Sequence, residues 1–154
     1  MIYTAMLSDA DEIMEFIERE WKQNHILSKN KDFFLYEYAS KGALNFVISK
    51  SEDKINGILG FLKSSLDENS TVWTTMWKVS KSNGSPTLGL SMLSYLQSQG
   101  YKSVMSSGIN AATEEIYKYL GFHVGDLGHY YIPNWELEAY SIAKFNKENI
   151  DVSR

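Results

Sequence analysis

The stretch from Val72 to Leu93, VWTTMWKVSKSNGSPTLGLSML, decides the fold of this chain. Its first part, Val72–Val79, is rich in Val, Trp and Thr and predicts a β-strand. Apolar residues at helical spacing then predict a helix over Pro86–Gln99, capped by Ser85. A strand that leads through a Gly/Ser turn into a helix directs backbone N–H groups and the positive end of the helix dipole to one point, which favours an anion such as phosphate. A plain βα unit without a ligand fits the stretch equally well.

The composition is that of one globular domain, because the chain has 154 residues, of which 44% are hydrophobic and 22% charged. A net charge of −4 argues against a nucleic-acid partner. The chain has no Cys, and His25, His123 and His129 lack the spacing of metal ligands, so we expect no metal. No apolar run approaches the ~18 residues of a membrane span, and no signal-peptide pattern opens the chain. We therefore expect a cytoplasmic location and no membrane partner.

The remaining residues predict an α+β protein. Its expected elements are a strand over Ile2–Leu7, a helix capped by Ser8, a short helix over Asp32–Ala39, strands over Ala43–Lys50, Lys54–Ser64 and Ser103–Ser107, a helix over Ala111–Leu120, and late strands over Phe122–Val124 and Tyr130–Ile132. The three strands between residues 43 and 79 predict an antiparallel meander. The helix between Val72–Val79 and Ser103–Ser107 is long enough for a crossover, so these strands should run parallel. Lys22–Lys31 is expected to be a loop.

The order of the expected elements resembles the GNAT acyltransferase superfamily, and two stretches carry the resemblance. Gly84–Leu90 (GSPTLGL) lies where that family has its pyrophosphate loop, and Asn110–Phe122 (NAATEEIYKYLGF) matches its signature of Asn, Tyr and Leu-Gly-Phe. The resemblance covers residues 1–132 and implies a GNAT-like fold in α/β/α layers. In that fold, helices flank a mixed, mostly antiparallel sheet with one splayed parallel strand pair. The loop departs from the family pattern at Thr87, where a glycine is usual, and at Pro86, which lacks an N–H.

The resemblance implies an acyl-CoA-dependent N-acyltransferase, in which a small primary amine attacks acetyl-CoA directly within a ternary complex. The residues that it assigns to the coenzyme are Met76, Trp77, Lys78, Val79, Gly84, Ser85, Thr87, Leu88, Gly89 and Asn110, with Lys81 near enough to help. Tyr117 matches the family's general acid, which protonates the departing thiolate. Packing on a helix face is the alternative role for Tyr117, and helix capping is the alternative for Asn110. Residues 133–154 lie beyond the resemblance and are expected to form a last strand or helix and a polar tail.

The amine acceptor and the general base remain open. The segment Trp21–Ser28 (WKQNHILS) resembles GNAT-like proteins of bacterial surface-polysaccharide synthesis, which makes an amino sugar one candidate acceptor. Candidate substrate-binding residues are Trp21, His25 and Tyr130, although Trp21 is expected to face the core. Trp73 and Trp77 are further candidates for stacking on a sugar ring, and Glu18, His25, Glu37 and His129 are candidate bases. The alternative function is a catalytically silent GNAT-fold binding or accessory domain, and a homodimer is allowed.

Overall fold

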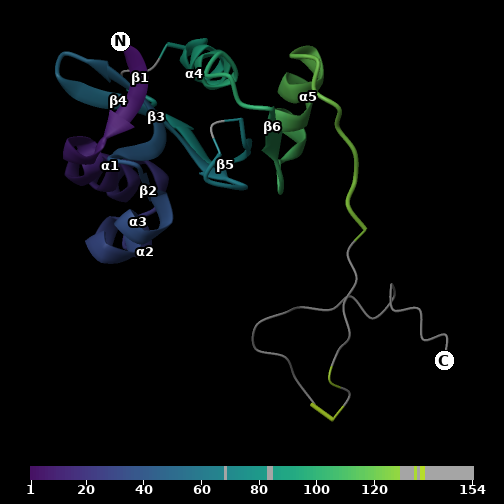
Figure 1. The fold of residues 1–154 in the computed structure, drawn as a ribbon, viewed down its shortest axis with the longest axis horizontal. Coiled ribbons are helices and arrows are strands. Elements are labelled where there is room, and N and C mark those ends of the chain that lie inside the picture. The colour runs from purple at the N-terminus through teal and green to yellow at the C-terminus, as the bar shows by residue number, and fades with distance from the viewer. Residues whose placement is uncertain (68, 83–84, 129–133, 135, 138–154) are drawn as a thin grey trace. The chain divides into compact units, whose positions relative to one another are not determined.

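The computed structural model describes residues 1–67, 69–82, 85–128, 134 and 136–137, and these belong to two compact units, Met1–Asn110 and Ala111–Arg154 (Figure 1). The first unit contains β1 (Ile2–Met6), the 3-10 helix η1 (Leu7–Asp9), α1 (Ala10–Phe16), the π-helix η2 (Ile17–Trp21), α2 (Ile26–Lys29), α3 (Lys31–Tyr38), β2 (Ala39–Ser40), β3 (Ala43–Ser51), β4 (Lys54–Lys63), β5 (Thr71–Val79), α4 (Leu88–Gln97) and β6 (Ser103–Ser106). The second unit contains α5 (Ala111–Tyr119).

The strands of the first unit form one mixed sheet in the order β1-β3-β4-β5-β6, with β2 paired to β3. All neighbouring strands are antiparallel except β5 and β6, which run parallel with Thr71 opposite Ser103 and Thr74 opposite Ser106. The sheet confirms the predicted α+β class, the meander and the single parallel pair. The turn between β3 and β4 places Glu52 and Asp53 at φ 51° and 60°, the left-handed geometry that a two-residue hairpin turn requires.

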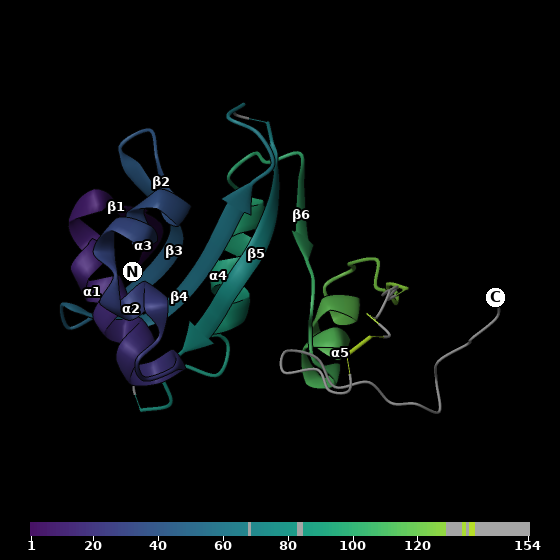
Figure 2. The same cartoon turned by 90° about the horizontal axis from the view of Figure 1, so that it is seen from below.

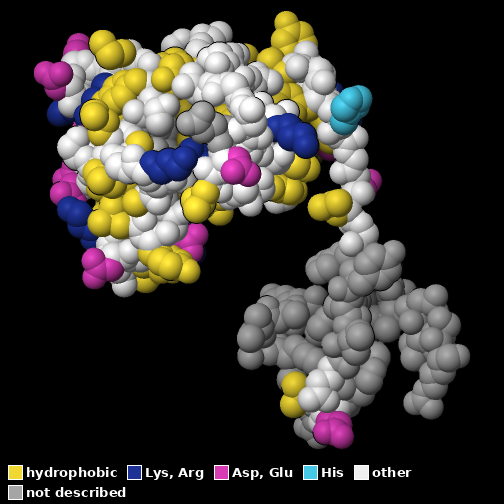
Figure 3. All heavy atoms as spheres, viewed as in Figure 1, with side chains coloured by type: hydrophobic (Ala, Val, Ile, Leu, Met, Phe, Trp, Pro, Cys, Tyr) yellow, Lys and Arg dark blue, Asp and Glu magenta, His cyan; other side chains and the backbone are white. Residues whose placement is uncertain are grey.

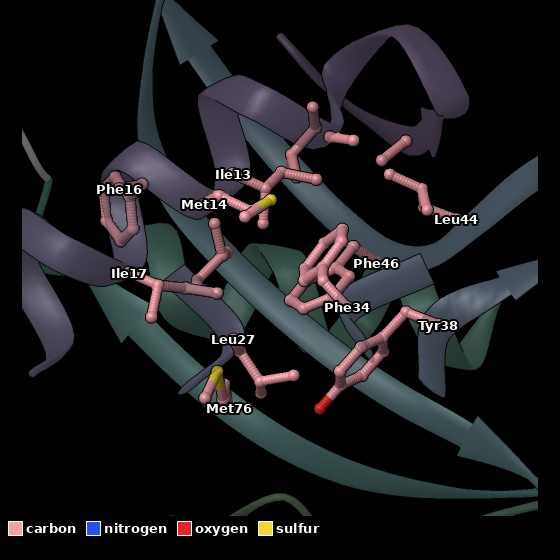
Figure 4. Packing of buried hydrophobic residues seen from close by; sticks show 14 of the residues in the cluster. Ile13, Met14, Phe16, Ile17, Leu27, Phe34, Tyr38, Leu44, Phe46 and Met76 are labelled. Atoms are coloured by element: carbon pink, nitrogen blue, oxygen red, sulfur yellow. The ribbon is translucent and has the colours of Figure 1, made fainter. Parts of the chain in front are cut away.

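Helices cover both faces of this sheet: α1 to α3 lie on one side and α4 on the other (Figures 1 and 2). On the first face, α1, α2 and α3 enclose a cluster of buried residues that includes Ile13, Ile17, Phe34, Tyr38, Phe46 and Met76 (Figure 4). The ring centroids of Tyr38 and Phe46 are 4.5 Å apart, and those of Phe34 and Phe46 are 5.7 Å apart. Outside this cluster, Met92, Leu93 and Leu96 of α4 are fully buried. The sheet therefore has a core on each side.

A β-bulge lies between β4 and β5 at Gly60. Leu59 pairs with Trp77 and Phe61 pairs with Thr74, so Gly60 alone stands opposite Thr75 and Met76. A Cβ atom on Gly60 would lie 2.6 Å from Thr75 Oγ1 and 2.9 Å from the Phe46 ring. The sequence predicts a bulge or a close backbone contact from the glycines of this strand, and Gly60 shows both.

A partly buried network of charges joins the N-terminal elements to the sheet. Lys50 Nζ lies 3.0 Å from Asp9 Oδ1 and 2.6 Å from Glu12 Oε2. Asp9 also accepts the Met6 N–H at 2.9 Å, and Glu12 accepts the Ile55 N–H at 2.8 Å. Burial raises the pKa of Asp9, but the Met6 and Lys50 hydrogen bonds outweigh it and hold the pKa below its ordinary value. The hydrogen bond that Lys50 donates to the Glu12 carboxylate raises the pKa of Lys50 in turn.

Several sequence predictions are wrong in detail. Asp9, rather than Ser8, bonds the backbone where the first helical turns begin. The Lys22–Lys31 segment contains α2, because His25 Nδ1 accepts the Leu27 N–H and caps a short helix. The residues of Phe122–Val124 form no strand. Trp21 is 43% exposed, since it ends a π-helix at the surface instead of continuing the apolar stripe of α1. Tyr130–Ile132 and the predicted boundary at residue 132 lie outside the described residues.

The Asp9 network predicts a dependence of stability on pH. Because the folded state lowers the pKa of Asp9, its stabilisation is full above the ordinary value of about 3.9 and is lost as the pH falls through the lowered value. Asp9→Asn should therefore lower the free energy of unfolding at pH 7 by about 1–3 kcal/mol and reduce the loss between pH 5 and 2. Urea denaturation across this range measures both effects, with exposed Asp126→Asn as the control. If the free energy of unfolding fell equally with pH in Asp9→Asn and in the wild type, the prediction would be contradicted.

The bulge at Gly60 predicts that one added methyl group at this position lowers the stability of the protein. Gly60→Ala should lower the free energy of unfolding by about 1–3 kcal/mol, because the new Cβ collides with Thr75 Oγ1 and the Phe46 ring. Gly125→Ala is the matched control, since a Cβ there meets no atom within 4 Å. Denaturation midpoints measure the difference, and an unchanged midpoint for Gly60→Ala would show that the bulge relaxes freely.

Candidate functional site

The central feature of the candidate site is an edge of β5 that is only partly paired with β6. β4 pairs with β5 from Val72 to Val79, whereas β6 pairs with β5 only over Thr71–Thr74. Figure 2 shows the two parallel strands side by side at one end and separating toward the other. Within the described chain, the pairing of β6 with β5 therefore ends at Thr74, and the rest of this edge of β5 continues beyond β6. A strand edge of this kind offers backbone donors and acceptors that an extended ligand can bond.

The N-terminus of α4 follows β5 along the chain and supplies further backbone donors. The Leu88 N–H donates to the Ser85 carbonyl at 3.0 Å, so Ser85 to Leu88 form a turn and the helix begins at Leu88. The predicted helix start at Pro86 is therefore wrong, because the helix begins at Leu88. Thr87, and not Ser85, occupies the cap position. No side chain caps this end of the helix. Beyond Leu88, the N–H groups of Gly89 and Leu90 in the first turn have no partner within the helix and suit an anion.

Gly89 has a packing role that the sequence does not reveal. A Cβ atom at Gly89 would lie 3.2 Å from Trp77 Nε1 and 3.3 Å from Trp77 Cζ2. The indole of Trp77, which projects from β5, thus packs against the first turn of α4. The contact fixes the helix N-terminus beside the part of β5 that lies beyond the β6 pairing, and it brings two of the predicted coenzyme-binding residues together.

The end of β5 is also fixed by a hydrogen-bond chain from η2. Ser80 Oγ donates to Glu20 Oε1 at 3.1 Å and lies 3.1 Å from Ser82 Oγ, and Arg19 Nε lies 3.4 Å from the same Glu20 oxygen. Sequence reasoning missed Glu20 and Ser80, since nothing in the sequence pattern links residues so far apart. Lys78 and Lys81 lie on either side of Ser80 in the chain, and Lys78 is half-buried whereas Lys81 is exposed. Both charges are therefore close to the start of the segment that joins β5 to α4.

Tyr117 lies in α5, in the second unit, and it is 3% exposed. The Phe122 N–H donates to the Tyr117 carbonyl and the Gly121 N–H to the Lys118 carbonyl, both at 3.0 Å, while Gly121 adopts φ 80°. These are the two hydrogen bonds of a Schellman motif. The Phe122 ring packs edge-on against Tyr117 with centroids 4.8 Å apart, the apolar contact that accompanies this motif. A glycine directly after the predicted helix Ala111–Leu120 favours this left-handed helix end, and Gly121 adopts it.

The other predicted residues are dispersed. Asn110 is the last residue of the first unit. Trp21 and His25 flank the surface segment between η2 and α2, and Glu18 in η2 accepts the Ser28 hydroxyl at 2.6 Å and the Asn24 N–H at 2.9 Å. The hydrogen bonds from Ser28 and Lys29 lower the pKa of Glu18. Glu37 is half-buried in α3. Gly84, His129 and Tyr130 lie outside the described residues.

The surface shows both signs of charge. On the face seen in Figure 3, Lys and Arg side chains alternate with Asp and Glu among hydrophobic ones over the described residues. Within the described part of the chain, no helix combines the length and apolar character of a membrane span. Nor does any group of three or more His, Asp or Glu side chains among those residues converge as metal ligands would.

Comparison with known proteins identifies the fold. No family model matches the sequence, and no curated protein is significantly similar to it. Solved structures do match. Glucosamine-6-phosphate N-acetyltransferase from Arabidopsis thaliana has a TM-score of 0.60 at 14% identity, over 87% of this chain and 98% of that chain. A GNAT family acetyltransferase from Streptococcus pneumoniae has a TM-score of 0.60 at 14% identity, over 86% and 97%.

A third solved structure contains a ligand. It is AAC(6')-Iy in complex with the bisubstrate analog CoA-S-monomethyl-acetylneamine, with a TM-score of 0.62 at 12% identity over 87% of this chain and 97% of that chain. At such identities the likeness shows the fold alone. The chain therefore has the fold of the GNAT acetyltransferases.

Proposed function

We propose that this protein is an N-acetyltransferase that moves the acetyl group of acetyl-CoA to a small primary amine. The observation that carries the proposal is the early end of the β5–β6 pairing at Thr74, beyond which β5 leads toward the N-terminus of α4. An extended arm with amide groups can pair with such an edge, and a pyrophosphate suits such a helix end. Coenzyme A carries both groups at the required ends.

The coenzyme would be held by backbone and charge together. Its pantetheine arm would run along Met76–Val79, and its pyrophosphate would lie against Ser85–Gly89 with Lys78 and Lys81 nearby. Pro86 precedes the helix, so its missing N–H takes nothing from the first turn of α4. Asn110 and Gly84 complete the proposed set by the resemblance of their motifs.

The chemistry would be a direct attack of the amine nitrogen on the thioester carbonyl. A C–N bond forms, the carbonyl oxygen becomes an oxyanion that backbone N–H groups stabilise, and the C–S bond then breaks. Tyr117 would donate its proton to the departing thiolate, and a base would take the proton that the amine loses. A thiol relay is excluded, because the chain has no Cys.

The structure ranks the candidate bases by what they already bond. Glu18 holds Ser28, Asn24 and Lys29, and a carboxylate with a lowered pKa is a weak base, so we assign it to the loop and not to proton transfer. His25 uses Nδ1 as a helix cap and keeps Nε2 for other contacts. His25 and Glu37 therefore remain the proposed bases among the described residues, beside His129.

The proposed acceptor is the amino group of an amino sugar. Its support is the resemblance of Trp21–Ser28 to proteins of polysaccharide synthesis, together with the exposed position of Trp21 and the half-buried position of His25. One matched structure is named for a sugar phosphate, glucosamine 6-phosphate. Trp21, His25 and Tyr130 are the residues proposed to contact the sugar.

Coenzyme binding tests the proposal. Calorimetry should show acetyl-CoA binding to the wild type, and Lys81→Gln should weaken it about tenfold through the loss of one charge-assisted contact. Lys63→Gln is the control, because Lys63 lies at the other end of the β4–β5 pair, opposite Val72. A wild type that does not bind acetyl-CoA would contradict the proposal and favour the silent binding domain.

The proposed acid gives a separate prediction. Tyr117→Phe should lower kcat about 10²-fold while the Kd for acetyl-CoA stays unchanged, because the hydroxyl acts only as the C–S bond breaks. Tyr119→Phe is the matched control, since Tyr119 lies on the same helix and is 86% exposed. Steady-state kinetics with an amine that the wild type accepts measure the effect. Equal turnover of Tyr117→Phe and wild type would leave Tyr117 with a packing role only.

A further inference from the structure

A second surface adjoins β5 near the end of its pairing with β6, on the face of the sheet that carries α1 to α3. Trp73 pairs with Leu62 on β4 and with Met105 on β6, so the three side chains form a row across the sheet. Leu62 packs on the cluster beneath α1 and α3, which places the row on that face. The helices cover the β3 and β4 end of the face. Toward β6 the side chains of the row are no longer covered by these helices, and Trp73 is 38% and Met105 41% exposed.

The bulge places a hydroxyl pair beside this row. Tyr38, buried in α3, donates its hydroxyl to Thr75 Oγ1 at 3.1 Å, and Thr75 is itself exposed. Figure 4 shows the Tyr38 ring beside Phe34 and Phe46, with its hydroxyl oxygen directed out of the cluster. Gly60 leaves the room in which Thr75 Oγ1 lies. Because Thr75 Oγ1 already accepts the Tyr38 proton, its own proton is available as a donor.

The position of Thr75 along β5 connects it with the proposed reaction. β6 pairs with β5 as far as Thr74, so Thr75 is the first residue of β5 beyond that pairing. If the pyrophosphate lies near α4, the coenzyme arm runs back along β5 for about 16 Å of extended chain before β6 closes its path. The acyl end then stops beside Thr75. An acceptor that reaches it must lie close to Trp73.

We propose that Trp73 and Thr75 are further residues of the acceptor subsite, which takes an amino sugar with the apolar face of its ring on the Trp73 indole and a ring hydroxyl accepting the Thr75 proton. Tyr38 is a positioning residue, because it fixes Thr75 Oγ1 and never reaches the sugar. The inference rests on the proposed acetyl transfer and names its acceptor site. Burial raises the pKa of the Tyr38 phenol, which keeps it a donor at neutral pH.

The test uses the full chain, acetyl-CoA, and D-glucosamine as the probe. Thr75→Val and Tyr38→Phe should each raise KM for D-glucosamine about tenfold and leave the Kd for acetyl-CoA unchanged, since each removes one hydroxyl. Thr75→Ser, which keeps the hydroxyl, should restore KM to within about twofold of the wild type. The double variant should be no worse than either single variant, because both changes break one hydrogen-bond chain.

Matched controls separate the subsite from general effects on β5. Thr71→Val removes another hydroxyl from the same strand, one that lies 2.9 Å from Ser103 Oγ, and should leave KM unchanged. Trp73→Ala should abolish saturation transfer from the protein to the sugar ring protons in NMR, whereas Trp73→Phe should retain it. Folding of each variant is checked by its denaturation midpoint.

The outcomes distinguish this inference from the function on which it rests. A wild type that does not bind acetyl-CoA would overturn both the proposed acetyl transfer and the acceptor subsite. Intact acetyl-CoA binding with an unchanged KM for Thr75→Val, or with undiminished saturation transfer for Trp73→Ala, would overturn the acceptor subsite alone. A wild type that acetylates aliphatic amines but neither binds nor acetylates D-glucosamine would overturn the sugar class.

Discussion

The structure of the first unit depends on a limited parallel pairing: β6 stays with β5 only as far as Thr74. Beyond that point β4 still pairs with β5 as far as Val79, whereas β6 no longer does. The backbone groups on the β6 side of a strand need partners of another kind where strand pairing ends. The packing around β5 holds the strand in place. Trp77 packs against Gly89 of α4, and Thr75 bonds Tyr38 of α3. Ser80, the residue that follows β5, bonds Glu20 of η2.

The sheet could be predicted from the sequence because its signals are local. The hairpin at Glu52-Asp53 has turn residues between two apolar runs, and the parallel pair follows from the length of the crossover between residues 79 and 103. The end of α5 could be predicted from the sequence as well, since Gly121 directly follows an amphipathic stretch. In these places propensity, patterning and tertiary structure agree.

The details of the candidate site could not be predicted, because they depend on contacts between distant residues. Tyr38 meets Thr75 and Glu20 meets Ser80 only after the sheet has formed. α4 begins at Leu88 and not at the predicted Pro86, because the Leu88 N–H donates to the Ser85 carbonyl in a turn that precedes the helix. Trp21 looked like a core residue because its spacing continues the stripe of α1. The π-helix, however, adds a residue to the turn and rotates the side chain away from the core.

The Schellman motif at the end of α5 bears on how such proteins are recognised. Its parts are a left-handed glycine, two backbone hydrogen bonds and an aromatic pair, and all of them serve to stop a helix. A descendant that had lost every catalytic group would still need them to fold. The Leu-Gly-Phe signature is thus a mark of ancestry in backbone geometry, and a search that relies on it retrieves relatives of the fold whether or not they remain enzymes.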